Sequence, residues 1–143
     1  MEISNTQKWL INSKLNRIRT SVKNINLGGC GLFAYHMYLA LKDRSIETKI
    51  LLLGTKQLPI HLILQLDEFN YLDSKGINTK EDLLKEFGGG IKLTEISNDE
   101  LESMLTNIKW NKAFDYWFTD VNFQPKSNKD FLVESIKKEF YGL

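Results

Sequence analysis

The stretch Asn26-Leu27-Gly28-Gly29-Cys30-Gly31 runs directly into an apolar segment with helical spacing, and it contains the only cysteine of the chain. Glycines before a helix allow a sharp backbone turn and leave room for another molecule to approach. The start of a helix also favours negative charge, because unpaired backbone N–H groups and the helix dipole point there. Since the thiolate is the attacking form of cysteine, Cys30 is a candidate nucleophile. The backbone N–H groups of Cys30 and Gly31 could then hold an oxyanion.

The alternative for Cys30 is a small buried apolar residue, which is the commoner role of a free cysteine. That alternative leaves the three surrounding glycines unexplained, since glycine weakens a helix at its start or in its interior. The segment therefore favours a nucleophile over an inert core residue.

Composition predicts one globular domain over residues 1–143, because 42% hydrophobic and 26% charged residues are ordinary for such a domain. The net charge of +1 gives no reason to expect a nucleic-acid or membrane partner. A basic run near the N-terminus is expected to be a solvated helix face; it comprises Lys8, Lys14, Arg17, Arg19 and Lys23. A single cysteine fits a reducing compartment, and the N-terminus has no signal pattern, so we expect a cytoplasmic protein.

Periodicity and turn residues predict an α+β fold with extra helices at both ends and a small, mostly antiparallel sheet between them. The cysteine helix is apolar nearly all round and should be central and buried. The predicted helices cover 5–23, 30–42, 79–87, 97–108 and 127–140; the predicted strands cover 48–53, 61–66, a segment from 71 that stops at Gly76, and a possible edge strand at 91–96. The aromatic region 110–124 is ambiguous, either core or the lining of a partner groove.

His61 is the candidate base, because it opens a strand and can project from the sheet toward a helix N-terminus. His36 lies within the cysteine helix, six positions after the cysteine, and faces away from it. A base needs an orienting group, and Asp73 returns toward His61 if their strands form a hairpin. Loops with an odd number of residues put both on one face: one centred on Asp67 pairs them directly, and one centred on Glu68 makes them diagonal neighbours. Asp67 itself is about 20 Å along the strand, too far to orient the ring.

Three segments together resemble the papain-like cysteine peptidase superfamily, and within it the transglutaminase-like branch, which also holds arylamine acetyltransferases. They are Gly28-Gly29-Cys30-Gly31-Leu32-Phe33-Ala34, His61-Leu62-Ile63-Leu64 and Tyr71-Leu72-Asp73-Ser74-Lys75-Gly76. The resemblance covers about residues 24–76 and implies a nucleophile on a helix tip packed on a small antiparallel sheet. It implies Cys30 as nucleophile, His61 as base then acid, and Asp73 as orienter. Where papain-like enzymes often have an oxyanion-binding glutamine this chain has none, and Asn24 and Asn26 are the candidates.

The sequence thus predicts a small thiol hydrolase that cleaves a peptide or isopeptide bond through an acyl-thioester intermediate. Two alternatives stay open: transglutaminase- or acetyltransferase-like acyl transfer, and an inactive papain-like fold that binds a protein. The expected partner is a protein or peptide substrate, and the oligomeric state stays undetermined. We expect no cofactor and no metal, because one cysteine and two histidines at dissimilar spacings match no zinc pattern. The run Gly88-Gly89-Gly90 lacks the lysine and hydroxyl of a phosphate loop and is expected to be a turn or hinge.

Overall fold

The computed structural model describes residues 2–22, 30–54, 59–88, 90, 92–106 and 125–141. The predicted oxyanion donors Asn24 and Asn26 and the aromatic region 110–124 lie outside these residues. No helix in the described part is both long and apolar enough to pass through a bilayer.

The centre of the fold is a five-stranded sheet in the order β4-β3-β2-β1-β5, and every neighbouring pair is antiparallel. Its strands are β1 (Lys49–Gly54), β2 (Pro59–Gln65), β3 (Tyr71–Asp73), β4 (Gly76–Asn78) and β5 (Leu93–Ile96). The α+β class and the edge position of the 91–96 strand are confirmed. The short strand β4 was not predicted, since three residues are too few to show an alternating pattern.

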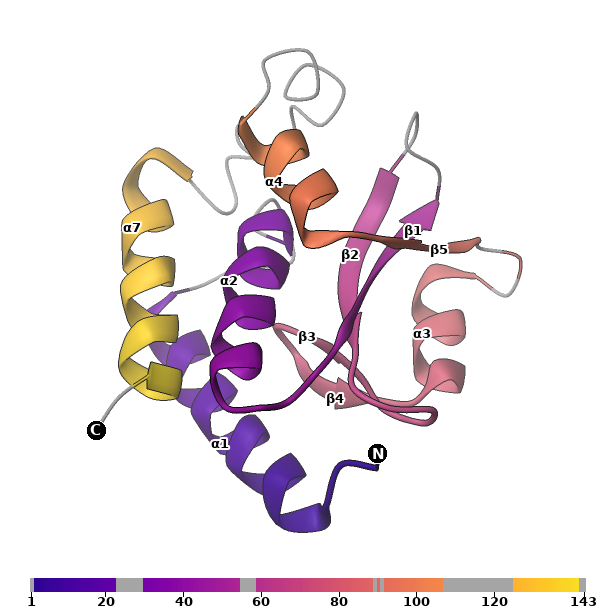
Figure 1. Cartoon of the computed structure of the whole chain (residues 1–143), viewed down its shortest axis with the longest axis horizontal. Coiled ribbons are helices and arrows are strands. Elements are labelled where there is room, and N and C mark those ends of the chain that lie inside the picture. The colour runs from indigo at the N-terminus through magenta and orange to yellow at the C-terminus, as the bar shows by residue number, and fades with distance from the viewer. Residues whose placement is uncertain are drawn as a thin grey trace.

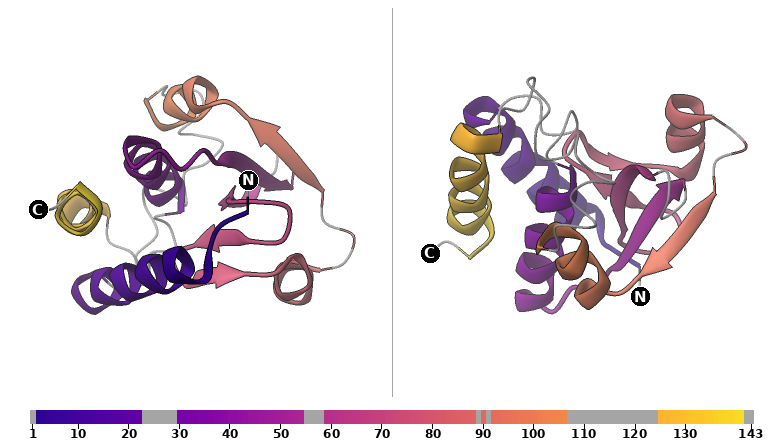
Figure 2. Two further views of the ribbon diagram at one scale, coloured as in Figure 1. Left: turned by 60° about the horizontal axis from the view of Figure 1, so that its bottom comes forward. Right: turned by 90° about the horizontal axis from the view of Figure 1, so that it is seen from above.

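Helices cover both faces of the sheet (Figure 1). Helix α2 (Cys30–Asp43) packs against one face, with α1 (Asn5–Ser21), α4 (Asn98–Thr106) and α7 (Pro125–Ile136) around it. Helix α3 (Lys80–Phe87) lies on the opposite side, as the turned views of Figure 2 also show. The π-helix η1 (Lys137–Tyr141) continues α7, which begins two residues before the expected start at 127.

Two apolar clusters follow from the alternation of side chains along β1 and β2. Leu62 and Leu64 face the large cluster that contains most of α2, whereas Ile63 faces the smaller cluster beneath α3. Helix α2 has buried residues around most of its circumference, as a central helix should. The layering leaves the N-terminal tip of α2 close to the sheet, where the candidate nucleophile lies.

Candidate active site

Cys30 is the first residue of α2, and its side chain is 2% exposed. It belongs to the large apolar cluster, together with side chains from α1, α2 and the sheet. The cysteine is free, since the chain contains no second one. Burial alone suits an inert core thiol, so the polar groups beside the sulfur decide whether it has a chemical role.

His61 is the polar group next to this thiol. It lies near the beginning of β2, which packs against α2, and its side chain is also 2% exposed. The ring is hydrogen-bonded to Asp73, and the Cys30 side chain lies close enough to act on its protonation. Its Nε2 atom lies 3.3 Å from Oδ2 of Asp73. Because Nε2 faces Asp73, Nδ1 is the ring nitrogen left to exchange a proton with the sulfur.

The register of the β2–β3 hairpin brings Asp73 to His61. Leu64 pairs with Leu72, so the hairpin is centred on Glu68. This is one of the two registers that keep both side chains on one face, and it makes them diagonal neighbours. Asp73 is 1% exposed, so the two polar groups meet away from bulk water. The three predicted triad side chains are therefore brought together.

The carboxylate of Asp73 is held in one orientation by its own turn. Oδ1 accepts a hydrogen bond from the backbone N–H of Lys75 at 2.9 Å, and Oδ2 faces the His61 ring. An aspartate that bonds a backbone N–H two residues onward is typical of a turn-forming residue. Here the second oxygen of the same carboxylate faces the imidazole and can orient it.

The protonation of His61 reflects two opposing effects. Burial pulls the pKa of His61 down, because a charged ring loses its hydration. Hydrogen bonds to Asp73 and Cys30, and the negative charges that those two groups can carry, act in the other direction and prevail. Together they raise the pKa of His61 to about 9. The ring therefore holds its proton through neutral pH, which places a positive charge beside the sulfur.

Helix α1 hydrogen-bonds to the β3–β4 hairpin, which carries Asp73. The sequence did not predict these contacts. Arg19 donates from Nη1 to the backbone carbonyl of Ser74 at 2.6 Å, immediately after Asp73. Asn12 accepts at Oδ1 from the backbone N–H of Ile77, at 2.9 Å. The expectation that the N-terminal basic run is only a solvated face is wrong for Arg19. Its guanidinium satisfies a carbonyl of the turn beside the site.

Phe87 is a further residue that sequence reasoning did not single out. Its ring stacks on the His61 ring, with centroids 5.0 Å apart and planes 24° from parallel. It is the last residue of α3, before Gly88 turns the chain with a φ of 102°. An apolar residue at the end of an amphipathic helix predicts burial, but nothing in its spacing names the ring it meets. Phe87 limits how the imidazole can rotate.

The two residues that the sequence placed outside the triad, His36 and Asp67, lie elsewhere, as expected. His36 is half-buried in α2, with its ring edge-on to Tyr35 at 5.0 Å. Asp67 accepts hydrogen bonds from the backbone N–H groups of Ile3 and Phe69, and so fixes the β2–β3 loop. Within the described ranges, no group of three or more His, Cys, Asp or Glu side chains could hold a metal ion.

The geometry of Cys30, His61 and Asp73 is thus established from this chain alone. No known relative was found. Comparison with protein-family models, with curated proteins and with solved structures gives no match. Interpretation of the site therefore depends on its chemistry.

The arrangement resembles the set of groups used in nucleophilic attack on a carbonyl group. A sulfur at a helix tip, a ring that can take and return its proton, and a carboxylate that fixes the ring are the parts that such a reaction needs. A structural role for the same three side chains would require only satisfied hydrogen bonds. It would not require the cysteine to be one of the partners, since a thiol is a weak donor and acceptor.

Proposed function

We propose that this protein is a cytoplasmic thiol hydrolase with a papain-like core, which cleaves a peptide or isopeptide bond. Cys30 is the nucleophile, His61 the general base and then acid, and Asp73 the group that orients the ring. The observation that carries the proposal is that one buried imidazole is hydrogen-bonded to the carboxylate and interacts with the thiol. The chain order of cysteine, histidine and aspartate, on a helix tip and a hairpin, supports it.

In the proposed reaction, the Cys30 sulfur attacks the carbonyl carbon and a tetrahedral intermediate forms with negative charge on oxygen. The imidazolium of His61 gives its proton to the leaving nitrogen, the C–N bond breaks, and an acyl-thioester stays on Cys30. The neutral ring then takes a proton from water, which attacks the thioester carbon. Cleavage of the C–S bond releases the acid and restores the thiolate.

Acyl transfer to an amine is the second candidate, and the burial of the site favours it. Cys30, His61 and Asp73 are each no more than 2% exposed. A site that excludes water protects a reactive thioester from hydrolysis until an amine acceptor arrives. The two candidates share the first half of the reaction and differ only in what resolves the thioester.

The test uses 4-nitrophenyl acetate, which acylates reactive thiols and releases a coloured product. Mass spectrometry should find one acetyl group on the wild-type chain, and fragmentation should place it on Cys30, the single cysteine. Cys30→Ala should abolish the label, and His61→Gln should slow it by about 10²–10⁴-fold. His36→Gln is the matched control, since it removes the other histidine.

Adding hydroxylamine or a primary amine then separates hydrolysis from transfer. Loss of the acetyl group that the amine accelerates more than it accelerates cleavage of a free acetyl-thioester indicates a transferase. Equal labelling of wild type and His61→Gln would contradict both enzymatic candidates and leave the inactive binding module.

A further inference from the structure

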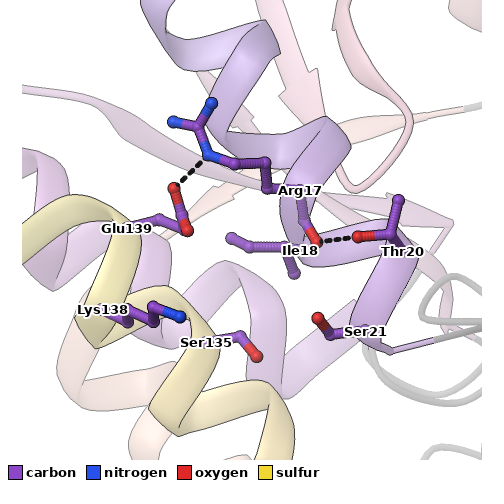
Figure 3. Close-up of a pocket in the computed structure, with 7 residues that line it drawn as sticks. All are labelled: Arg17, Ile18, Thr20, Ser21, Ser135, Lys138 and Glu139. Atoms are coloured by element: carbon purple, nitrogen blue, oxygen red, sulfur yellow. Dashed lines mark hydrogen bonds and ion pairs between the residues drawn. The ribbon is translucent and has the colours of Figure 1, made fainter.

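A second polar site lies between the end of α1 and the π-helix η1, and none of the three triad residues lines it. It is a pocket of about 280 Å³ (Figure 3). Small-molecule pockets typically measure about 300–1,000 Å³, so this one suits a ligand smaller than a drug molecule. Its lining is dominated by charged and hydroxyl groups: Arg17, Thr20, Ser21, Ser135, Lys138 and Glu139.

The two cationic side chains of the pocket, Arg17 and Lys138, have N–H donors that no described residue accepts. Arg17 uses Nε on the carboxylate of Glu139, at 2.6 Å, which neutralises that carboxylate. The two terminal nitrogens of the guanidinium make no hydrogen bond within the described residues. Lys138 directly precedes Glu139 in the π-helix η1, and its ammonium also has no partner among the described residues. These groups can therefore bind a ligand without breaking an internal contact.

Of the three hydroxyl groups of the pocket, one donates to the backbone and two bond to no described residue. Thr20 donates to the backbone carbonyl of Arg17 at 2.6 Å, so its hydroxyl proton is already used. Ser21 and Ser135 come from facing helices, and both side chains lie at the gap between them (Figure 3). Neither hydroxyl bonds to a group in the part of the chain that the structure describes. Two uncommitted hydroxyls on the same side of the pocket as the Lys138 ammonium form a donor set suited to an anion.

Two further cationic side chains, which do not line the pocket, contact the π-helix η1. Lys14 donates to the carbonyl of Glu139, and Arg44 donates to the carbonyl of Phe140. Burial lowers the pKa of Lys14, the nearby charges of Arg44 and Arg17 lower it further, and Glu139 only partly opposes them. Crowded cations repel one another, so an added anion would relieve the repulsion.

We propose that this pocket binds a small phosphorylated ligand or free phosphate, held by Lys138, Ser21 and Ser135, with Arg17 pairing the Glu139 carboxylate at the rim. A phosphoryl group presents several acceptor oxygens and up to two negative charges, which match the unpaired donors of the pocket. Lys138 and Glu139 belong to the π-helix η1. This backbone form is rare in proteins, and where it occurs it is often at a functional site. The proposal is independent of the chemistry at Cys30.

The experiment measures binding of inorganic phosphate by calorimetry and by thermal unfolding, with sodium chloride at equal ionic strength as the reference. Phosphate should raise the unfolding temperature above that of the chloride reference. Lys138→Gln should weaken phosphate binding about tenfold, as expected for the loss of one charge-assisted hydrogen bond. Ser135→Ala should weaken it by a smaller factor.

Lys137→Gln is the matched control, because Lys137 is the exposed neighbour of Lys138 and does not line the pocket. It removes the same charge and should change phosphate binding by less than about twofold. Glycerol phosphate in a parallel titration separates the two sources: tighter binding than inorganic phosphate indicates a phosphomonoester, and equal or weaker binding indicates free phosphate. Equal losses in Lys137→Gln and Lys138→Gln, or a phosphate response no larger than that to chloride, would overturn the proposal.

Discussion

NMR titration of the two histidine rings should show one that stays protonated to about pH 9, and this ring should be His61. The pKa of His61 rises from 6.5 to about 9. Since one pKa unit corresponds to about 1.4 kcal/mol, the folded protein favours the protonated ring by about 3 kcal/mol. Burial alone would give the opposite sign, so the measurement decides whether the partners of the ring outweigh its desolvation.

Asp73→Asn is the perturbation that tests the cause. The amide keeps the size of the carboxylate but removes its charge, while the burial of the ring persists. The pKa of His61 should therefore fall by about 1–3 units, the range for loss of a close opposite charge. His36→Gln assigns the signals, because the chain has only two histidines.

The same shift has a consequence for stability with a defined sign. A raised pKa means that the folded state binds the proton more tightly than the unfolded state. The stabilisation from His61 is therefore complete below pH 6.5 and is lost as pH rises through about 9. Urea unfolding of Asp73→Asn should accordingly show its greatest loss relative to wild type at the acid end of this range. A wild-type His61 ring that titrates at or below 6.5 would refute the reasoning.

Three further predictions concern the surroundings of the triad. Arg19→Gln should slow acetylation of the cysteine without unfolding the protein, because the turn beside the carboxylate loses its charged donor; kinetics and circular dichroism check this. Gly76→Ala should cost about 1–3 kcal/mol in urea unfolding, since Gly76 has a φ of 126° and an added Cβ would lie 2.9 Å from a side-chain oxygen; Gly90→Ala, in open space, should cost far less. Phe87→Leu should cost about 1 kcal/mol in the same assay through loss of ring stacking, and an unchanged unfolding midpoint would contradict that contact.

Local signals in the sequence predicted the boundaries of several elements. Ser4 and Gln7 form the capping box that opens α1, and Thr79 with Asp82 forms the one that opens α3. Both rest on contacts three residues apart, which a sequence displays directly. The two-residue period of a strand also restricted Asp73 and His61 to two registers of the β2–β3 hairpin. Only the folded chain selects between those two.

The supporting contacts of the site could not be predicted, because they join distant parts of the chain. Arg19 and Ser74 are 55 positions apart, and the residues that stack as rings, His61 and Phe87, belong to different elements. Neither pair leaves a periodic pattern in the sequence. The strand β4 could not be predicted for a different reason: it forms because it pairs with β3, and its own three residues do not indicate a strand.

The most direct test of the central claim is the rate of Cys30 alkylation by iodoacetamide at pH 6 and pH 9, followed by mass spectrometry. Restricted access to a buried sulfur slows both rates equally, so their ratio reports ionisation alone. An ordinary thiol with the reference pKa of about 8.5 reacts roughly a few hundredfold faster at pH 9 than at pH 6. The wild-type ratio should be below about tenfold, because a protonated His61 beside the sulfur favours the thiolate already at pH 6, and His61→Gln should restore the large ratio. A ratio of a few hundredfold in the wild type would contradict an activated Cys30.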